Sequence, residues 1–165
     1  MTVVAAVGLG SNLGNRLLNL RNALRHVKTA NPGALQVLQT SDVFETPPWG
    51  VTDQPHFLNA CLTAECALSP EELLALLKDI EAKMGRKETR RWGERMIDLD
   101  ILAMGSLIYS SSGLRVPHAD MHRRSFVLVP LAQVLPDWIH PVTNRSVAEM
   151  TEDFDKDGFV RICRL

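Results

Sequence analysis

The chain has 165 residues, of which 45% are hydrophobic and 22% charged, a composition typical of globular proteins and unlike that of disordered or fibrous ones. This length favours a single domain over residues 1–165, long enough to bury about two-thirds of its surface on folding. Eighteen basic and nineteen acidic residues give a net charge of -1, which excludes a general polyanion-binding surface but leaves room for a local basic patch.

The cysteines and the N-terminal stretch indicate the compartment. Cys61, Cys66 and Cys163 form no CxxC pair, and an odd count fits no closed disulfide framework. Cys61 and Cys66 are also an odd number of residues apart on one predicted strand, so they should point to opposite faces. The N-terminus has no basic region followed by a long apolar run, and no apolar run is long enough to span a bilayer. We therefore expect a cytoplasmic protein with free thiols.

The first half of the chain predicts three strands and one helix. Residues 2–10 form a short apolar run, rich in β-branched residues and ending in glycines, which predicts a buried strand. Either Asn12 or Asn15 caps the helix that follows. Its single apolar stripe consists of Leu17, Leu20, Leu24 and Val27. Residues 35–45 and 57–68 are predicted strands, and two consecutive prolines keep the loop between them out of a sheet.

The second predicted helix has clear signals at both ends. Ser69 is its cap, Pro70 takes the first turn, Glu72 completes a capping box, and Gly85 ends the helix. The buried stripe consists of Leu73, Leu76, Leu77, Ile80 and Met84. Then follow a polar loop (RKETRRWGER), a strand around MIDLDILAM, a serine-rich turn, a short strand, a loop and two further helices. The order β-α-β-β-α-β predicts an α+β fold with a ferredoxin-like core, an antiparallel sheet with helices packed on it.

Two aspartates share one face of the strand MIDLDIL. Side-chain alternation puts Ile97, Leu99 and Ile101 on one face, and Asp98 and Asp100 on the other. Carboxylates this close repel each other, and magnesium suits such a pair because it takes oxygen ligands from one or two carboxylates and from phosphates. The alternative is an ordinary half-exposed strand with an acidic outer face.

Several basic residues precede this strand, namely Arg86, Lys87, Arg90, Arg91 and Arg95. The rigid fork of arginine suits phosphate oxygens, and carboxylates for magnesium beside arginines for phosphate are what phosphoryl transfer requires. A solvated charged loop, partly paired through Glu88 and Glu94, is the competing interpretation.

Two other motifs carry weaker signals. The glycines of GLGSNLG are wrongly spaced for a dinucleotide fingerprint, so a tight strand-to-helix turn forming one wall of a site is favoured. His118, Asp120 and His122 could suggest zinc, but no fourth ligand is evident. The adjacent Arg123 and Arg124 favour an anion-binding edge, with His118 as a phosphate contact or a structural histidine.

A small set of aromatic residues lies in or beside polar stretches, namely Trp49, Phe57, Trp92 and Phe126. Two such rings could hold a flat heterocycle, although core packing would explain any one of them. Asn59 shares the strand face of Phe57 and could recognise the edge of a ring through its amide.

Taken together, GLGSNLGNR, ETPPWG, QPHFLNA, SPEELL…IEAKMGR, RRWGERMIDLDIL and VPHADMHRRSFVLVPL resemble one family, the 6-hydroxymethyl-7,8-dihydropterin pyrophosphokinases of folate biosynthesis. They occur in the family's order and cover about residues 5–136. The resemblance implies transfer of pyrophosphate from MgATP to the hydroxymethyl group of 6-hydroxymethyl-7,8-dihydropterin, releasing AMP. The expected partners are ATP and the pterin, with no nucleic acid and no membrane, and the chain is expected to be a monomer.

The resemblance also implies roles for individual residues. Asp98 and Asp100 would hold two magnesium ions, and a mobile catalytic loop would carry Arg86, Arg91, Trp92 and Arg95. The other implied ATP contacts are His118, Arg124, Leu74, Glu81 and Ile101. The implied pterin contacts are Phe57, Phe126, Asn59, Thr46, Pro47 and Trp49.

The chain departs from the family pattern at Glu88, Gly113 and Ala119, all in regions that handle the nucleotide. Arg115 is near enough to Gly113 to replace the arginine that is missing there. Two other functions compete. A nucleic-acid-binding module would have the same fold, but the chain lacks an aromatic RNA-binding motif. A silent pterin or nucleotide binder would not need Asp98 and Asp100.

Overall fold

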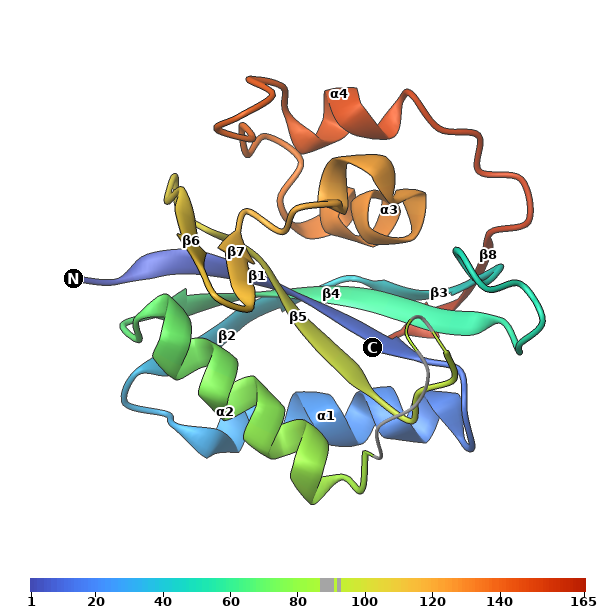
Figure 1. The fold of residues 1–165 in the computed structure, drawn as a ribbon, viewed down its shortest axis with the longest axis horizontal. Coiled ribbons are helices and arrows are strands. Elements are labelled where there is room, and N and C mark those ends of the chain that lie inside the picture. The colour runs from blue at the N-terminus through green and yellow to red at the C-terminus, as the bar shows by residue number, and fades with distance from the viewer. Residues whose placement is uncertain (87–90, 92) are drawn as a thin grey trace.

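The computed structural model describes residues 1–86, 91 and 93–165, and its main element is a six-stranded antiparallel sheet (Figure 1). The strands are β1 (Val3–Ser11), β2 (Leu35–Thr40), β3 (Asp42–Thr46), β4 (Phe57–Cys66), β5 (Asp98–Met104) and β8 (Val160–Arg164). They run in the order β5-β1-β4-β3-β8, with β2 also paired to β4. A separate hairpin joins β6 (Tyr109–Ser111) to β7 (Leu114–Val116). The prediction of an antiparallel sheet covered by helices is confirmed.

Helices cover both faces of the sheet. Figure 1 shows α1 (Arg16–Ala30) and α2 (Pro70–Lys83) below it, and α3 (Ser125–Val134) and α4 (Val147–Thr151) above it. A short 3-10 helix, η1 (Met121–Arg123), precedes α3. Among the described residues, no helix combines the length and the apolar character needed to cross a membrane.

The helix ends follow local sequence signals. Asn15, and not Asn12, caps α1 by accepting a hydrogen bond from the Leu18 backbone N–H at 3.1 Å. Ser69 and Glu72 form the predicted capping box of α2. Gly85, just beyond α2, adopts φ +82°, a left-handed conformation that glycine takes without a steric penalty.

The observed strands differ from the predicted ones in two ways. The strand expected over 35–45 is broken at Ser41, whose Oγ accepts the Cys61 N–H at 2.8 Å and so replaces a main-chain partner. The chain also returns to the sheet in β8, which the sequence analysis did not predict. β8 is short and largely exposed, so it lacks the apolar pattern by which strands are recognised.

The two faces of the sheet have different roles. On β1, β4 and β5, one set of alternating residues packs against α1 and α2 in the larger core, which includes Val7, Leu62 and Leu99. The other set faces α3 and α4, where Ala6, Cys61 and Leu102 contribute to a second core. Cys61 and Cys66 therefore lie on opposite faces, as predicted.

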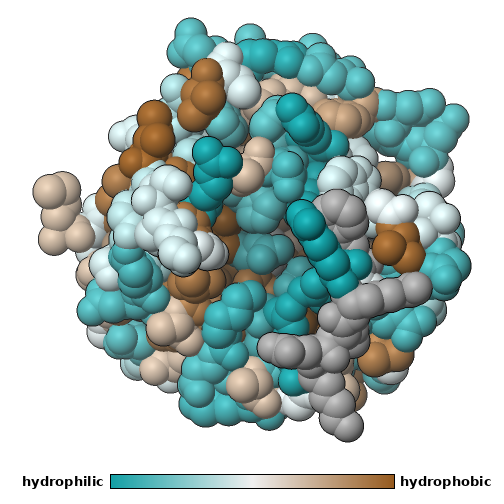
Figure 2. Space-filling view, viewed as in Figure 1, coloured by the Kyte–Doolittle hydropathy of each residue, from teal (hydrophilic) through white to brown (hydrophobic). Residues whose placement is uncertain are grey.

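Exposed apolar side chains gather near the β6–β7 hairpin. Figure 2 shows them at the upper left of a surface that is otherwise largely hydrophilic. Leu107 and Ile108, which directly precede β6, are 39% and 64% exposed. This hairpin follows the Met104 end of β5, whereas Asp98 lies at the other end of that strand.

Candidate active site

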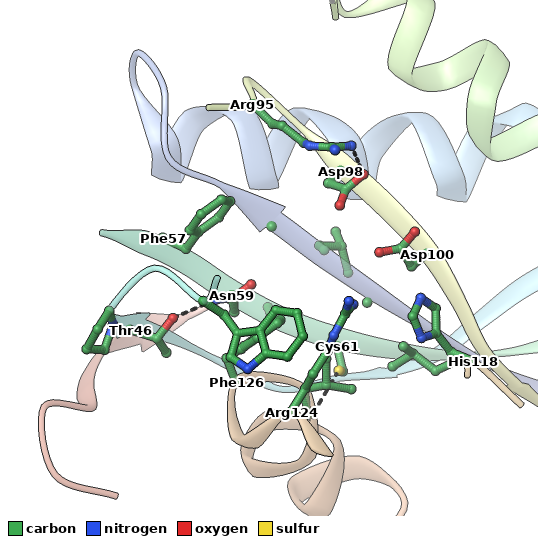
Figure 3. A pocket seen from close by; sticks show the side chains of 18 of the residues that line it. Thr46, Phe57, Asn59, Cys61, Arg95, Asp98, Asp100, His118, Arg124 and Phe126 are labelled. Atoms are coloured by element: carbon green, nitrogen blue, oxygen red, sulfur yellow. Dashed lines mark hydrogen bonds and ion pairs between the residues drawn. The ribbon is translucent and has the colours of Figure 1, made fainter. Parts of the chain in front are cut away.

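A cavity opens on the part of the sheet that α3 leaves uncovered (Figure 3). The space inside it is about 810 Å³, part of it open solvent. Alternate residues of three neighbouring strands supply its floor, namely Gly8 and Gly10 of β1, Phe57, Asn59 and Cys61 of β4, and Asp98, Asp100 and Leu102 of β5. The period of two that places core residues on one face therefore places these residues together on the other.

One end of the cavity is aromatic. Phe57 and Phe126 line it, and Trp49 lies beside Phe126 with ring centroids 6.5 Å apart. Asn59 is buried beneath these rings, and its amide nitrogen donates a hydrogen bond to Thr46 Oγ1 at 2.7 Å. This bond fixes the orientation of the amide. This end of the cavity can therefore hold a flat ring and recognise the ring's polar edge.

The other end of the cavity is charged. The side chains of Asp98 and Asp100 both point from β5 into it, and Arg95 reaches toward Asp98 (Figure 3). Arg95 Nη1 lies 3.4 Å from Asp98 Oδ1, and Arg86 Nη1 lies 3.0 Å from the same oxygen. Two arginines thus meet at one carboxylate, so this end of the cavity presents both cationic and anionic groups.

The environment of Asp100 indicates that a cation would be stabilised here. Burial, and then repulsion by the Asp98 carboxylate, raise the pKa of Asp100 well above its usual range. A divalent cation between the two carboxylates would relieve that repulsion, and magnesium commonly takes one or two carboxylates and completes its shell with phosphate oxygens and water. The donor set in this part of the cavity therefore fits magnesium.

His118 and Arg124 lie on a third side of the cavity. The His118 main-chain N–H donates to Leu102 O at 2.9 Å, which holds this loop against β5. Burial, and then the nearby Arg124 guanidinium, lower the pKa of His118, so its imidazole is neutral at pH 7. Arg124 lies 4.7 Å from the Trp49 ring centroid and within 3.3 Å of Asp120 Oδ2. A neutral donor and a fixed cation thus face the carboxylates.

His118, Asp120 and His122 do not converge on a common point, which contradicts a zinc site there. His118 Nδ1 accepts the Asp120 N–H at 3.2 Å, and the His122 ring instead packs against His140. In the part of the chain that the structure describes, no group of three or more histidine, cysteine, aspartate or glutamate side chains is placed to hold a metal ion.

Comparison with known proteins places the chain in a family. The family model described as 7,8-dihydro-6-hydroxymethylpterin-pyrophosphokinase (HPPK) matches residues 6–136. The chain belongs to the HPPK family. HPPK enzymes are transferases that move pyrophosphate from ATP to a hydroxymethyl pterin in folate synthesis, so the predicted family, reaction and enzyme class are confirmed.

Relatives of two kinds match the chain. Pyrophosphokinases from Methylorubrum extorquens and Haemophilus influenzae are 41% and 37% identical to it, over 96% and 97% of this chain and 98% of each relative. A bifunctional folate synthesis protein from Arabidopsis thaliana is 49% identical over 78% of this chain, which spans 23% of that protein.

Solved structures show the same fold. A Plasmodium falciparum HPPK-DHPS triple mutant matches with a TM-score of 0.79 at 16% identity, over 98% of this chain and 47% of that one. At this identity, the similarity is evidence for the fold alone.

Most of the residues that the HPPK resemblance assigned to the pterin and the phosphates come together in the cavity. Its lining includes Thr46, Pro47, Trp49, Phe57, Asn59, Arg95, Asp98, Asp100, His118, Arg124 and Phe126. Arg86 joins them through its ion pair with Asp98. Trp92 and residues 87–90 lie outside the described residues, so the prediction of a mobile loop there stays a prediction.

Several other residues assigned to ATP lie elsewhere. Leu74 is half-buried on α2, and the Ile101 side chain is buried in the core between the sheet and the helices. Arg115 on β7 and Arg91 are exposed. These four do not line the cavity, so their assignment to ATP rests on the resemblance alone.

Glu81 also has a different environment from the one expected. Its side chain is 2% exposed, and Oε1 accepts the Leu99 N–H at 2.7 Å, which joins α2 to β5. The same carboxylate forms ion pairs with Arg86 and Lys78. In this structure Glu81 holds Arg86 beside Asp98 and does not line the cavity.

Sequence reasoning missed several residues that build the cavity. Cys61 and Leu102 line the cavity but resemble ordinary core residues in the sequence. Asn12 and Gln54 lie within the motifs GLGSNLGNR and QPHFLNA, and the sequence indicated only a helix cap for the first and no role for the second, although both are buried next to the cavity. The GLGSN motif was the available signal, because a polar residue that directly follows a buried strand often lies at a site.

Proposed function

We propose that this cavity is where the chain transfers pyrophosphate from MgATP to 6-hydroxymethyl-7,8-dihydropterin. The observation that supports this most directly is the meeting of an aromatic slot with a paired-carboxylate site in one hollow (Figure 3). The pterin would lie between Phe57 and Phe126, with Asn59 and Thr46 at its polar edge. The triphosphate would lie along Asp98 and Asp100.

The reaction forms a bond between the pterin hydroxymethyl oxygen and the β-phosphorus of ATP. The bond from that phosphorus to the oxygen bridging it to the α-phosphorus breaks, AMP leaves with that oxygen, and the proton of the hydroxymethyl group passes to solvent. Magnesium held by Asp98 and Asp100 would neutralise charge on the phosphates. Catalysis of this kind depends mainly on position and charge, which this chain supplies by fixing both reactants on one rigid sheet.

Arginines and His118 would hold the phosphates from the other sides. Arg95 and Arg86 already lie beside Asp98. A phosphate anion that entered between them could replace Asp98 as the partner of either arginine. Arg124 is fixed by the Trp49 ring and Asp120. A cation already in position needs little reorganisation as charge develops on departing AMP.

The finer points of the architecture are also proposals. The order β5-β1-β4 followed by β2 and β3, with α1 and α2 on one face, supports a ferredoxin-like core. We propose that residues 1–165 form one pyrophosphokinase domain, that two magnesium ions act in it, and that the chain is a cytoplasmic monomer. Leu74, Glu81, Arg91, Trp92, Ile101 and Arg115 remain candidates for binding ATP.

The direct test is to incubate the protein with MgATP and the reduced pterin and to measure AMP. Asp98→Asn and Asp100→Asn should each lower turnover by at least about a hundredfold, because each removes a charge from the phosphate site. Both should fold normally, because both side chains line the cavity and not the core, and removing one carboxylate relieves the repulsion between the two.

Asp153→Asn is the matched control. Asp153 is an exposed carboxylate paired with Arg145, outside the cavity, and its loss should leave turnover unchanged. A wild-type protein that makes no AMP would overturn the proposed function. Near-normal turnover of either Asp98→Asn or Asp100→Asn would overturn the metal assignment.

A further inference from the structure

Asn12 lies where three segments of the chain meet at the edge of the cavity. It directly follows β1, its side chain is buried, and the residue as a whole is 2% exposed. Its main-chain N–H donates to Arg95 O at 3.0 Å, and its Oδ1 accepts the Arg95 N–H at 2.8 Å. Asn12 therefore holds the main chain of Arg95 on both sides, 83 residues away in the sequence.

The amide nitrogen of Asn12 binds the loop on the pterin side. It donates to Gln54 Oε1 at 3.0 Å and to Pro55 O at 3.1 Å. Gln54 is also buried and donates in turn to Val51 O at 2.6 Å, so it braces the loop from within. This loop follows Thr46 and carries Trp49, which lines the aromatic end of the cavity.

We propose that Asn12 is a positioning residue that ties Arg95 to the 47–56 loop, so that the phosphate end and the pterin end of the site are held in register. The inference rests on the proposed function. Burying an amide and its hydrogen-bond partners without pairing them costs free energy. The three segments therefore favour the one arrangement in which the Asn12 amide keeps all of its partners. In that arrangement, the Arg95 side chain extends from a fixed main chain toward Asp98 (Figure 3).

The substitution Asn12→Asp separates the two halves of this contact. The carboxylate keeps an acceptor for the Arg95 N–H but removes both donors to the 47–56 loop, and it places negative charge opposite Gln54 Oε1 and Pro55 O. We expect the single-turnover rate of AMP formation to fall by about ten- to a hundredfold, the scale for a small misplacement of a catalytic group. The Kd for ATP should change less than about threefold, because ground-state contacts to ATP are kept.

A merely structural role would lower the rate whatever residue stands at position 95. The test is therefore to measure the effect of Asn12→Asp on the single-turnover rate in an Arg95→Ala background. If Asn12 acts through Arg95, Asn12→Asp should cost less than about twofold there, because the side chain that it positions is gone. Equal rate losses in the two backgrounds would overturn the proposal, as would a wild-type rate for Asn12→Asp.

A second variant serves if Asn12→Asp does not fold. Gln54→Met keeps the length of the side chain but removes the acceptor for Asn12, and its rate loss should likewise disappear in the Arg95→Ala background. Gln133→Ala is the control, because Gln133 is another bonded amide, between α3 and Asp42, outside the cavity. Its rate should match the wild type. A wild-type protein without activity would instead contradict the proposed function.

Discussion

Gly10 shows how a single residue shapes the site. A Cβ at this position would lie 3.0 Å from Asn59 Oδ1, closer than nearly all real contacts of a Cβ atom. Asn59 could avoid the clash only by turning, and that would strain its 2.7 Å hydrogen bond to Thr46. The glycines of the GLG motif line the cavity floor and leave room there for the Asn59 amide.

Gly10→Ala should weaken pterin binding by about 1–3 kcal/mol, the usual cost of disturbing a buried hydrogen-bonded group. Gly8→Ala is the matched substitution on the same strand, and its Cβ would make an ordinary 3.5 Å contact with the Leu102 side chain. Calorimetric titration with the pterin should show a clearly smaller loss for Gly8→Ala. Equal losses of pterin affinity for the two variants would mean that Gly10 does not act through Asn59.

At the scale of elements, the segment between α3 and α4 braces one side of the site. Trp138 Nε1 donates to Gly105 O at 2.8 Å, next to the end of β5, and its ring contacts the ring of His140. His140 in turn packs against His122 of η1, with ring centroids 5.9 Å apart. Because η1 lies between His118 and Arg124, this segment supports the loop that carries both.

Trp138→Phe should lower the free energy of unfolding by about 1 kcal/mol, since it removes one hydrogen bond and leaves Gly105 O unpartnered. Chemical denaturation monitored by circular dichroism would measure the change. Ile139→Ala, at the neighbouring 49% exposed position, should stay within about 0.5 kcal/mol of the wild type. A wild-type stability for Trp138→Phe would show that solvent replaces the lost donor.

For the whole molecule, His140 links stability to pH. Its imidazole is buried, and Nδ1 accepts the backbone N–H groups of Val142 and Thr143 at 3.2 and 3.3 Å. Burial, and then the neighbouring His122, lower the pKa of His140 below the value of about 6.5 for an unfolded chain. The unfolded chain then binds the proton more readily, so stability falls as the pH drops through about 6.5 toward the lower folded pKa.

His140→Asn should flatten this part of the stability profile. Asparagine can offer an acceptor to the same N–H groups but does not titrate. Relative to that of the variant, the free energy of unfolding of the wild type should fall as the pH is lowered from 7.5 to 5.5, about one unit to either side of the unfolded-chain pKa. His118, whose pKa is lowered, and Asp100, whose pKa is raised, add slopes of opposite sign that both proteins share, so the difference between the two profiles reports His140. Parallel profiles for the two proteins would contradict the assignment.

The sequence by itself determined the features that depend on neighbouring residues. Ser69 and Glu72 lie three positions apart and cap α2, and the period of two puts Asp98 and Asp100 on one strand face. The family motifs are local as well, so the reaction and most of the cavity residues could be predicted before any coordinates. The cap and the shared strand face follow from spacing and side-chain chemistry, which act over a few residues, whereas the reaction and the residue roles follow from the resemblance to the family.

Only the tertiary structure decided which distant groups become partners. Asn12 could cap a helix by its sequence, but it meets Gln54 and Arg95 because three loops converge after β1. Glu81 matches a family position in the ATP pocket, yet here it accepts the Leu99 N–H and holds Arg86. A buried polar group takes whichever partner the packing brings within about 3 Å, and that choice depends on the whole fold and not on local sequence.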